Sequence, residues 1–119
     1  MNEIALKQNI EAAWADRSRI QDDQVRSAVA QVLAQLDQGT LRVAHPESDG
    51  SWTVNEWVKQ AVLLNFLIQP METVEVGPFE FRDKMPLKRG YAQAGVRVVP
   101  HAGVRYGAHV APAVSYTHL

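Results

Sequence analysis

The chain has 119 residues, of which 46% are hydrophobic and 21% are charged, and its net charge is −1. This balance is typical of one modest globular domain, and the small net charge gives no basic face for a nucleic acid. The lack of cysteine excludes disulfides, thiolate metal sites and a cysteine nucleophile. The N-terminus has no signal-peptide pattern, and the longest apolar run, AVLL, is far too short for a membrane span, so we expect a soluble, cytoplasmic protein.

Two helices are predicted in the N-terminal third of the chain. Over residues 2–16, apolar side chains recur at helical spacing, at Ile4, Ile10, Ala13 and Trp14. The second helix is the clearer of the two, because its apolar positions form one continuous stripe made of Val25, Val29, Val32, Leu33 and Leu36. Either Asp22 or Asp23 can cap the start of this helix, and Gly39 can end it.

A hairpin and a third helix are predicted next. Residues 40–44, TLRVA, alternate and contain β-branched side chains, so they indicate a short strand. A turn cluster, HPESDGS, follows, and SWTV can return as the partner strand. Asn55 stands where an N-cap would precede the helix EWVKQAVLLNFLI, whose wide apolar face predicts burial and comprises Trp57, Val58, Ala61, Val62 and Leu64.

The segment after this helix has a weaker pattern. Pro70 closes the helix, and residues 73–86 alternate in places, with Gly77 and Pro78 breaking the run in the middle. This pattern indicates two short strands or irregular extended chain. Residues 87–95 indicate a linker or a single helical turn.

A period of six residues marks the stretch VVPHAG-VRYGAH-VAPAVS, residues 98–115. Valine opens each unit at Val98, Val104 and Val110, and a small residue or valine follows four places later. This period fits neither a flat strand nor a helix, but it is typical of a left-handed parallel β-helix, in which three hexapeptides complete one triangular coil. The valines would point into the prism, and the small residues would lie near its corners.

Two alternatives to this interpretation stay open. Three valines six residues apart can also arise by chance within two ordinary strands. A single coil also leaves its lower face uncovered, whereas solenoid units bury their apolar faces only against neighbours. Either the rest of the protein is missing, or the helical part caps the coil.

Three segments, WTVNEWVKQAVLLNF, FRDKMPLK and GVRVVPHAGVRYGAHVAP, occur in the order found in one enzyme family. With the second helix and its exit, VAQVLAQLDQGTLRVA, they resemble the N-terminal part of tetrahydrodipicolinate N-succinyltransferases from about residue 7 to residue 113. The resemblance implies an α+β fold with a helical domain at 1–95 and the first coil of a left-handed β-helix at 96–113. It also implies a homotrimer with active sites between subunits.

The activity that the resemblance implies is transfer of succinyl from succinyl-CoA to the amine of ring-opened tetrahydrodipicolinate, in lysine and diaminopimelate biosynthesis. The family's carboxylate-binding arginine matches Arg97 in GVRVVP. A planar guanidinium suits a dicarboxylate substrate, because it grips a carboxylate with two hydrogen bonds. A role restricted to pairing with a local acid is the alternative for Arg97. The family's catalytic acid and acyl-CoA contacts lie on later coils, so we expect this chain alone to be inactive.

The match ends after Ala113, and the tail, residues 114–119, reads VSYTHL. A codon string for this hexapeptide is similar to the transposase end sequence used in sequencing libraries. We therefore expect the tail to be translated adaptor DNA and the reading frame to be truncated. A genuine, unusual C-terminus is the alternative.

Other candidate residues have plainer interpretations. The spacing of the histidines at 45, 101, 109 and 118 is not that of a metal site, and we expect exposed surface positions for them. Asp83 and Lys84 can contact substrate but more simply form a surface pair beside a turn. The tryptophans at 14, 52 and 57 are predicted to lie in the core.

Two other functional classes remain as rivals. One is a non-catalytic helical binding or oligomerisation module, and the apolar Val98, Val104 and Val110 argue against it because such a module needs a polar end to its coil. The other is a helix-turn-helix DNA binder built on residues 2–36, which the net charge and the chain geometry after Gly39 disfavour.

Overall fold

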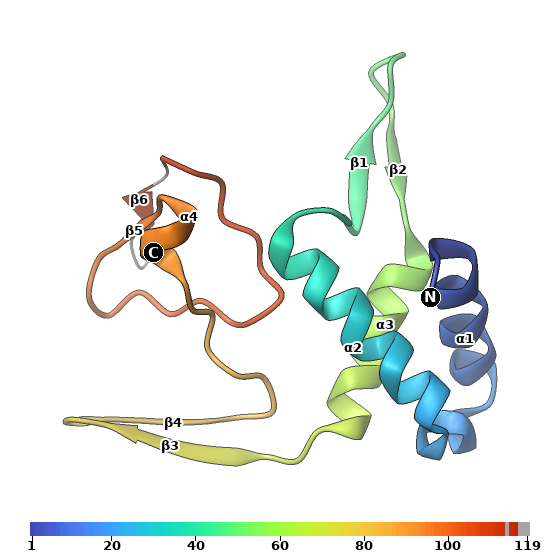
Figure 1. The fold of residues 1–119 in the computed structure, drawn as a ribbon, viewed down its shortest axis with the longest axis horizontal. Helices are drawn as coiled ribbons and strands as arrows, with labels where there is room; N and C mark the ends of the chain where they lie inside the picture. Colours follow the sequence, from blue (N-terminus) through green and yellow to red (C-terminus); the bar gives the residue numbers. More distant parts are fainter. Residues whose placement is uncertain (114, 117–119) are drawn as a thin grey trace.

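The computed structural model describes residues 1–113 and 115–116, and within them a helical body carries an extended arm (Figure 1). Three α-helices make the body: α1 (Glu3–Ala15), α2 (Asp23–Gln38) and α3 (Glu56–Ile68), with a 3-10 turn, η1 (Arg17–Gln21), joining the first two. The arm comprises a hairpin, a short helical turn and a loop that returns to its own start. This mixed helical and sheet architecture agrees with the α+β class, whereas the β-helix coil stays a prediction.

The helical core follows the predicted apolar stripes. All five stripe residues of α2 are buried, and so are Trp57, Val58, Ala61 and Leu64 of α3. In α1 the buried side chains are Leu6, Ile10 and Ala13, while Ile4 is exposed. Ile4, although it lies at helical spacing in the sequence, is therefore off the face that meets α2 and α3, on which Leu6 and Ile10 lie one turn apart.

The second helix, α2, ends at the glycine that the sequence predicted. Gly39 ends α2 with a left-handed φ of 81°, and the amides of Gly39, Thr40 and Leu41 return to carbonyls of the last turn. This use of the backbone explains why the strand predicted at 40–44 was placed too early. The strand β1 (Ala44–Pro46) begins only after the helix-ending bonds, and Leu41 joins the core instead.

Asn55 stands directly before α3 as predicted, but its side chain does not cap the helix. Its amide donates instead to the Arg42 carbonyl at 2.8 Å and lies 3.1 Å from His45 Nδ1. Asn55 thus ties the start of α3 to the incoming strand β1.

The first hairpin pairs β1 with β2 (Trp52–Val54) in antiparallel register, with Ala44 opposite Val54. It rises away from the helices, as Figure 1 shows, and all three residues of β2 are exposed. Trp52 is consequently 61% exposed, with the Arg42 guanidinium 5.8 Å from its ring centre. The prediction that Trp52 lies in the core was wrong, Trp14 is half-buried, and Trp57 is confirmed as buried.

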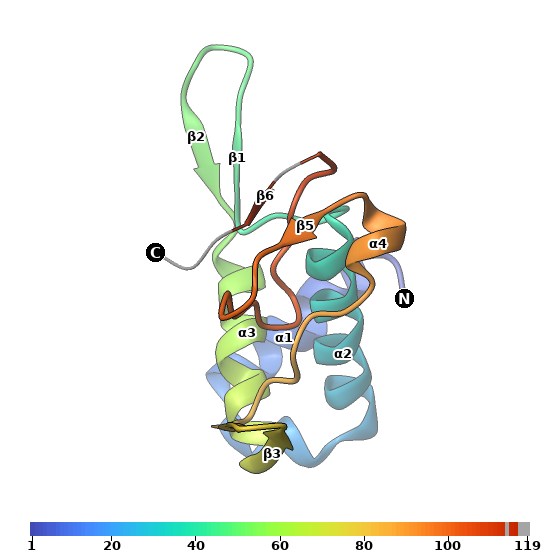
Figure 2. The same cartoon turned by 90° about the vertical axis from the view of Figure 1, so that its left-hand side faces the viewer.

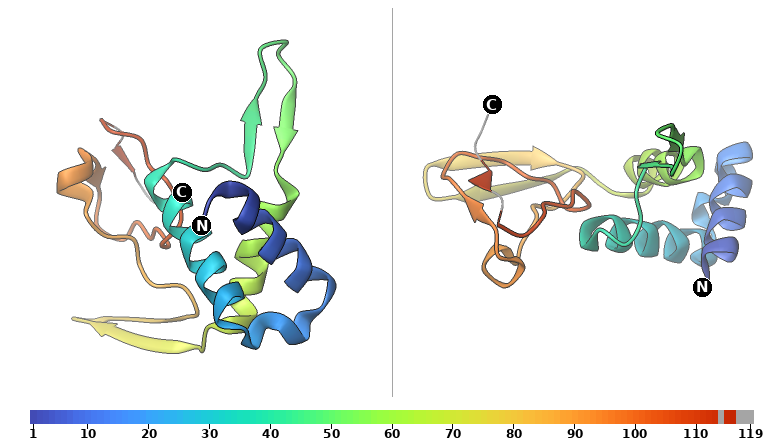
Figure 3. Two further views of the ribbon diagram at one scale, coloured as in Figure 1. Left: turned by 45° about the vertical axis from the view of Figure 1, so that its right-hand side comes forward. Right: turned by 90° about the horizontal axis from the view of Figure 1, so that it is seen from above.

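The second hairpin pairs β3 (Glu72–Val76) with β4 (Phe79–Asp83), and its turn lies at Gly77 and Pro78 as the sequence indicated. Gly77 has a φ of 57°, which suits glycine at this turn. Seen from above in Figure 3, the hairpin extends beside the loop formed by residues 96–113 and away from the helices. The linker after it contains the single helical turn α4 (Tyr91–Ala94), which confirms that alternative for 87–95.

The loop after α4 closes on itself at a spacing of eighteen residues. The amide of Ala113 donates to the Gly95 carbonyl at 2.8 Å, and β5 (Arg97–Val98) pairs in parallel with β6 (Ser115–Tyr116). Figure 2 shows the two short strands close together, level with α4 and well above β3. The domain boundary at residue 95 and the adaptor origin of residues 114–119 stay predictions, and the tail lies outside the described residues except for 115 and 116.

Gly39 offers a test of the contact between body and arm. A Cβ at this position would lie 2.8 Å from three ring carbons of His109, in addition to the cost of a left-handed φ. Gly39→Ala should therefore destabilise the chain by more than the roughly 1–2 kcal/mol that left-handed alanine costs. Gly50→Ala is the matched control, because Gly50 has a φ of 89° and open space around it.

Urea unfolding of the two variants measures the difference. The excess loss in Gly39→Ala should disappear in the double variant Gly39→Ala, His109→Ala, where the ring is absent. Equal losses in Gly39→Ala and Gly50→Ala would contradict the contact.

Candidate arginine site on the returning loop

Arg97 is the residue that the sequence singles out for ligand binding, and it lies on β5 where the loop closes. Val96 before it is buried, whereas the Arg97 side chain is exposed. The loop closure fixes its backbone from both sides, through the Ala113 amide on Gly95 and the pairing of Arg97 with Ser115. The Arg97 side chain therefore extends from a loop whose two ends are hydrogen-bonded to each other.

The Arg97 side chain forms no hydrogen bond or ion pair with any residue in 1–113 or 115–116. The alternative that it pairs with a local acid thus finds no partner in the part of the chain that the structure describes. A free, exposed guanidinium has its five N–H donors available to a carboxylate.

The loop that carries Arg97 is joined to the helices through Asp37 in the last turn of α2. Lys88 Nζ lies 2.7 Å from one Asp37 carboxylate oxygen and donates at 3.1 Å to the Asp37 carbonyl. The same carboxylate oxygen accepts the Gly107 amide at 2.9 Å. The side chains of Lys88 and Asp37 are only 7% and 20% exposed, so this is a largely desolvated ion pair. Burial raises the pKa of the nearby Tyr106 hydroxyl, and the negative charge of Asp37 adds to this effect.

A second ion pair ties the loop to the hairpin. Arg105 donates to both carboxylate oxygens of Asp83, each at 2.6 Å, and this hydrogen bonding lowers the pKa of Asp83. Backbone bonds run alongside, from the Lys88 amide to the Val104 carbonyl and from the Tyr106 amide to the Pro86 carbonyl. The partner of the Asp83 side chain is thus Arg105 rather than the predicted Lys84. The Lys84 ammonium group donates instead to the Phe66 carbonyl at 2.7 Å.

The histidines at 101 and 109 are exposed, as predicted. His101 meets the Phe79 ring edge-on at 5.0 Å, and His109 covers Gly39. Within residues 1–113 and 115–116 no group of three histidine, aspartate or glutamate side chains is arranged to hold a metal ion. No helix of that same part has the length and apolarity needed to cross a membrane.

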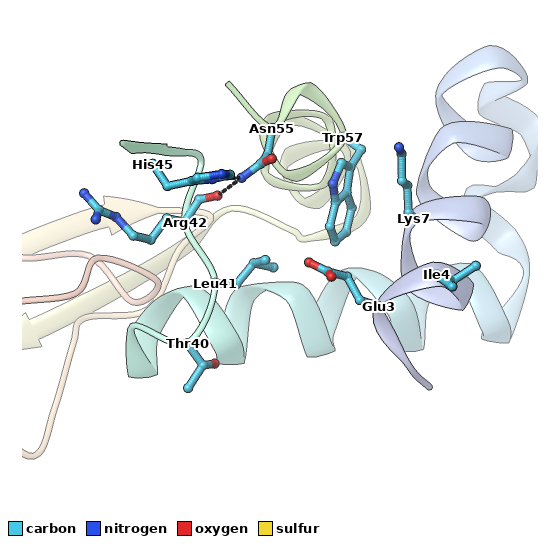
Figure 4. A pocket seen from close by; sticks show the side chains of 9 residues that line it. All are labelled: Glu3, Ile4, Lys7, Thr40, Leu41, Arg42, His45, Asn55 and Trp57. Atoms are coloured by element: carbon cyan, nitrogen blue, oxygen red, sulfur yellow. Dashed lines mark hydrogen bonds between the residues drawn. The ribbon is translucent and has the colours of Figure 1, made fainter. Parts of the chain in front are cut away.

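A polar cleft of about 480 Å³ lies elsewhere, between the start of α1, the exit of α2 and the start of α3 (Figure 4). Sequence reasoning did not predict this cleft, because its walls come from segments far apart in the chain. His45 and Asn55 in its wall are bonded to each other, and His45 also lies 3.0 Å from Glu47. Arg42 points away from Glu3 and Lys7 in Figure 4, so the charged groups do not converge on one ligand position.

Comparison with known proteins places the chain in a family. Residues 5–68 match the sequence profile described as "Tetrahydrodipicolinate N-succinyltransferase N-terminal", which is more than half of the chain. A 2,3,4,5-tetrahydropyridine-2,6-dicarboxylate N-succinyltransferase of Variovorax paradoxus is 43% identical over 116 residues, covering 89% of this chain and 42% of the relative.

The enzyme of the same name from Brucella ovis is 41% identical over 119 residues, covering 91% of this chain and 42% of that protein. The chain therefore spans less than half the length of these curated relatives. The profile and the two relatives name the same protein, and the matches to the relatives cover most of the sequence. The chain belongs to the tetrahydrodipicolinate N-succinyltransferase family.

Proposed function

We propose that the chain is the N-terminal part of an acyltransferase that moves succinyl from succinyl-CoA to the amine of ring-opened tetrahydrodipicolinate. This step belongs to lysine and diaminopimelate biosynthesis in the cytoplasm. Family membership supports the reaction class, and the names of the relatives supply the substrate. The observation that carries the role of this chain is the exposed Arg97 in GVRVVP, which has no partner in the described residues.

In the proposed reaction, the substrate amine attacks the thioester carbonyl carbon of succinyl-CoA. The carbon–sulfur bond breaks, an amide bond forms, the amine loses a proton, and CoA leaves as its thiol. Arg97 takes no part in these bond changes. Its role is to hold a substrate carboxylate so that the amine stays oriented toward the thioester, which is the positional contribution to rate.

We further propose that residues 96–113 form the first coil of a left-handed β-helix. The eighteen-residue spacing of the Ala113–Gly95 bond and of the β5–β6 pairing supports this, because three hexapeptides make one turn. Val104 is buried, while Val98 and Val110 are half-buried, as expected for inward positions with no neighbouring coil. The complete enzyme would be a homotrimer with its remaining coils and its catalytic acid beyond this chain.

The 119-residue chain alone should release no CoA from succinyl-CoA in the presence of the acceptor. A thiol-reactive dye measures this cleanly, because the chain contains no cysteine to react with the dye. The same assay on the full-length gene product should show turnover. Turnover by the chain alone would contradict the proposal that the catalytic acid lies on coils beyond it.

Substitution of Arg97 in the full-length gene product tests the binding role. Arg97→Gln removes a charge-assisted hydrogen-bond pair worth about 1.5–3 kcal/mol, so KM for the dicarboxylate should rise roughly 10- to 150-fold. KM for succinyl-CoA should change much less. Arg89→Gln is the matched control, because Arg89 is also exposed and lies outside the proposed site.

Arg97→Lys should recover only part of the loss, because an ammonium group lacks the two-pronged geometry. An unchanged KM for the dicarboxylate in Arg97→Gln, measured on folded protein, would overturn the assignment.

A further inference from the structure

Asn55 stands between two structures that compete for its side chain, the first hairpin and α3. It directly precedes α3, and asparagine is among the most favoured N-cap residues, yet its side chain makes no cap hydrogen bond. Its amide nitrogen donates instead to the Arg42 carbonyl at 2.8 Å and lies 3.1 Å from His45 Nδ1. The state of the His45 ring therefore bears on one of the two contacts that keep Asn55 away from the helix.

The contacts of the His45 ring determine which of its nitrogens carries the proton. An amide nitrogen can only donate, so Asn55 Nδ2 donates to His45 Nδ1, and Nδ1 must offer a lone pair. The other ring nitrogen, Nε2, lies 3.0 Å from Glu47 Oε1 and donates to that carboxylate. Figure 4 shows the Asn55 amide beside the ring. The structure thus requires a neutral imidazole with its proton on Nε2.

Glu47 can hold the His45 ring both before and after the ring is protonated. The Thr53 hydroxyl donates to the same Glu47 oxygen at 2.7 Å, and this bond, with a smaller contribution from His45, lowers the pKa of Glu47. Glu47 therefore stays an anion through the pH range in which histidines titrate. The other charged groups that line the cleft beside His45 come from α1 and from the segment before β1, and they are Glu3, Lys7 and Arg42.

We propose that Asn55 is a proton-controlled switch, which holds the first hairpin while His45 is neutral and caps α3 when His45 is protonated. Protonation places an N–H group on Nδ1, where it faces the N–H of the Asn55 amide, and two donors cannot bond to each other. Turning the amide over would only set its oxygen against the Arg42 carbonyl. Both conflicts disappear if the Asn55 oxygen accepts from the amides of Trp57 or Val58, the second and third residues of α3.

The switch should change the direction of the hairpin and leave its strands paired. Asn55 has a φ of −88° and a ψ of 83°, whereas an N-cap residue typically has an extended backbone. Capping would therefore rotate the link through which the hairpin leaves α3. Because Glu47 favours the protonated ring and Asn55 favours the neutral ring, the two effects on His45 oppose each other, and we expect no unfolding. This inference does not depend on the proposed reaction.

NMR of the 119-residue chain, from about pH 8 to about pH 5, follows each part of the switch. At the upper end, the His45 ring should carry its proton on Nε2. As the pH falls, the signals of the Asn55 side-chain amide should shift with the same midpoint as those of the His45 ring. Hydrogen-exchange protection of the Trp57 and Val58 amides should rise roughly 2- to 30-fold, which corresponds to the gain of an asparagine cap.

Three variants separate the switch from a general effect of pH. His45→Gln should abolish the response of the Asn55 amide and of α3, because glutamine does not titrate. His101→Asn is the matched control and should keep the response, since it removes an exposed histidine of the arm and asparagine tolerates the left-handed φ of 79° there. Asn55→Asp should keep the cap throughout, because an ionised carboxylate accepts hydrogen bonds and cannot donate to Arg42 or to neutral His45.

Three results would overturn the proposal. The first is a His45 ring that titrates while the Asn55 amide and the first turn of α3 stay unchanged. The second is a neutral His45 ring with its proton on Nδ1, because Asn55 could not then donate to it. The third is a response of α3 that survives in His45→Gln, which would assign the effect to another titrating group.

Discussion

The placement of the arm depends on one carboxylate that stands at the electrostatically wrong end of a helix. Asp37 lies in the last turn of α2, where the helix dipole is negative and an acidic side chain is disfavoured. The ammonium group of Lys88 offsets this unfavourable interaction, because its positive charge contacts both the Asp37 carboxylate and the Asp37 carbonyl. The carboxylate oxygen that Lys88 contacts also accepts the Gly107 amide. One side chain thereby fixes two points of the arm that lie nineteen residues apart in the sequence.

Two weaker contacts, from Asn65 and Lys84, also attach the arm to the helical body. Asn65 is buried in α3 and directs its amide to Met85 Sδ at 2.9 Å, a poor acceptor that still places the linker against the helix. The Lys84 ammonium group donates to the Phe66 carbonyl in the last turn of α3. Each of these joints uses a helix end or a helix side chain, so the arm is attached to the helical body at several points. The loop with Arg97 therefore takes its position from helices that are far from it in the sequence.

The parts of this structure that the sequence could predict are those with a local cause. The buried stripe of α2, the end of that helix at Gly39 and the turn at Gly77 and Pro78 each follow from residue spacing or backbone preference. Trp52 could not be placed correctly, because the hairpin that carries it leaves the body and no local signal reports that direction. The ion pair of Asp37 and Lys88 could not be predicted either, because its residues are fifty-one positions apart and nothing in the sequence indicates that they meet. Arg97 was singled out by resemblance alone, and its role in substrate binding stays a prediction.

The division of the structure into a helical body and a returning loop also bears on the proposed role of Arg97. An arginine binds a carboxylate well only if its own position costs little to maintain, because each rotatable joint between guanidinium and protein body lowers the effective concentration of the bound group. Here Arg97 is held by loop closure at Gly95 and Ala113, and the loop is held by the desolvated pair of Asp37 and Lys88. If Arg97 binds substrate as proposed, the helical body supports that role through the pair of Asp37 and Lys88. Under the same proposal, the body fixes where the dicarboxylate would meet residues supplied by the remainder of the polypeptide.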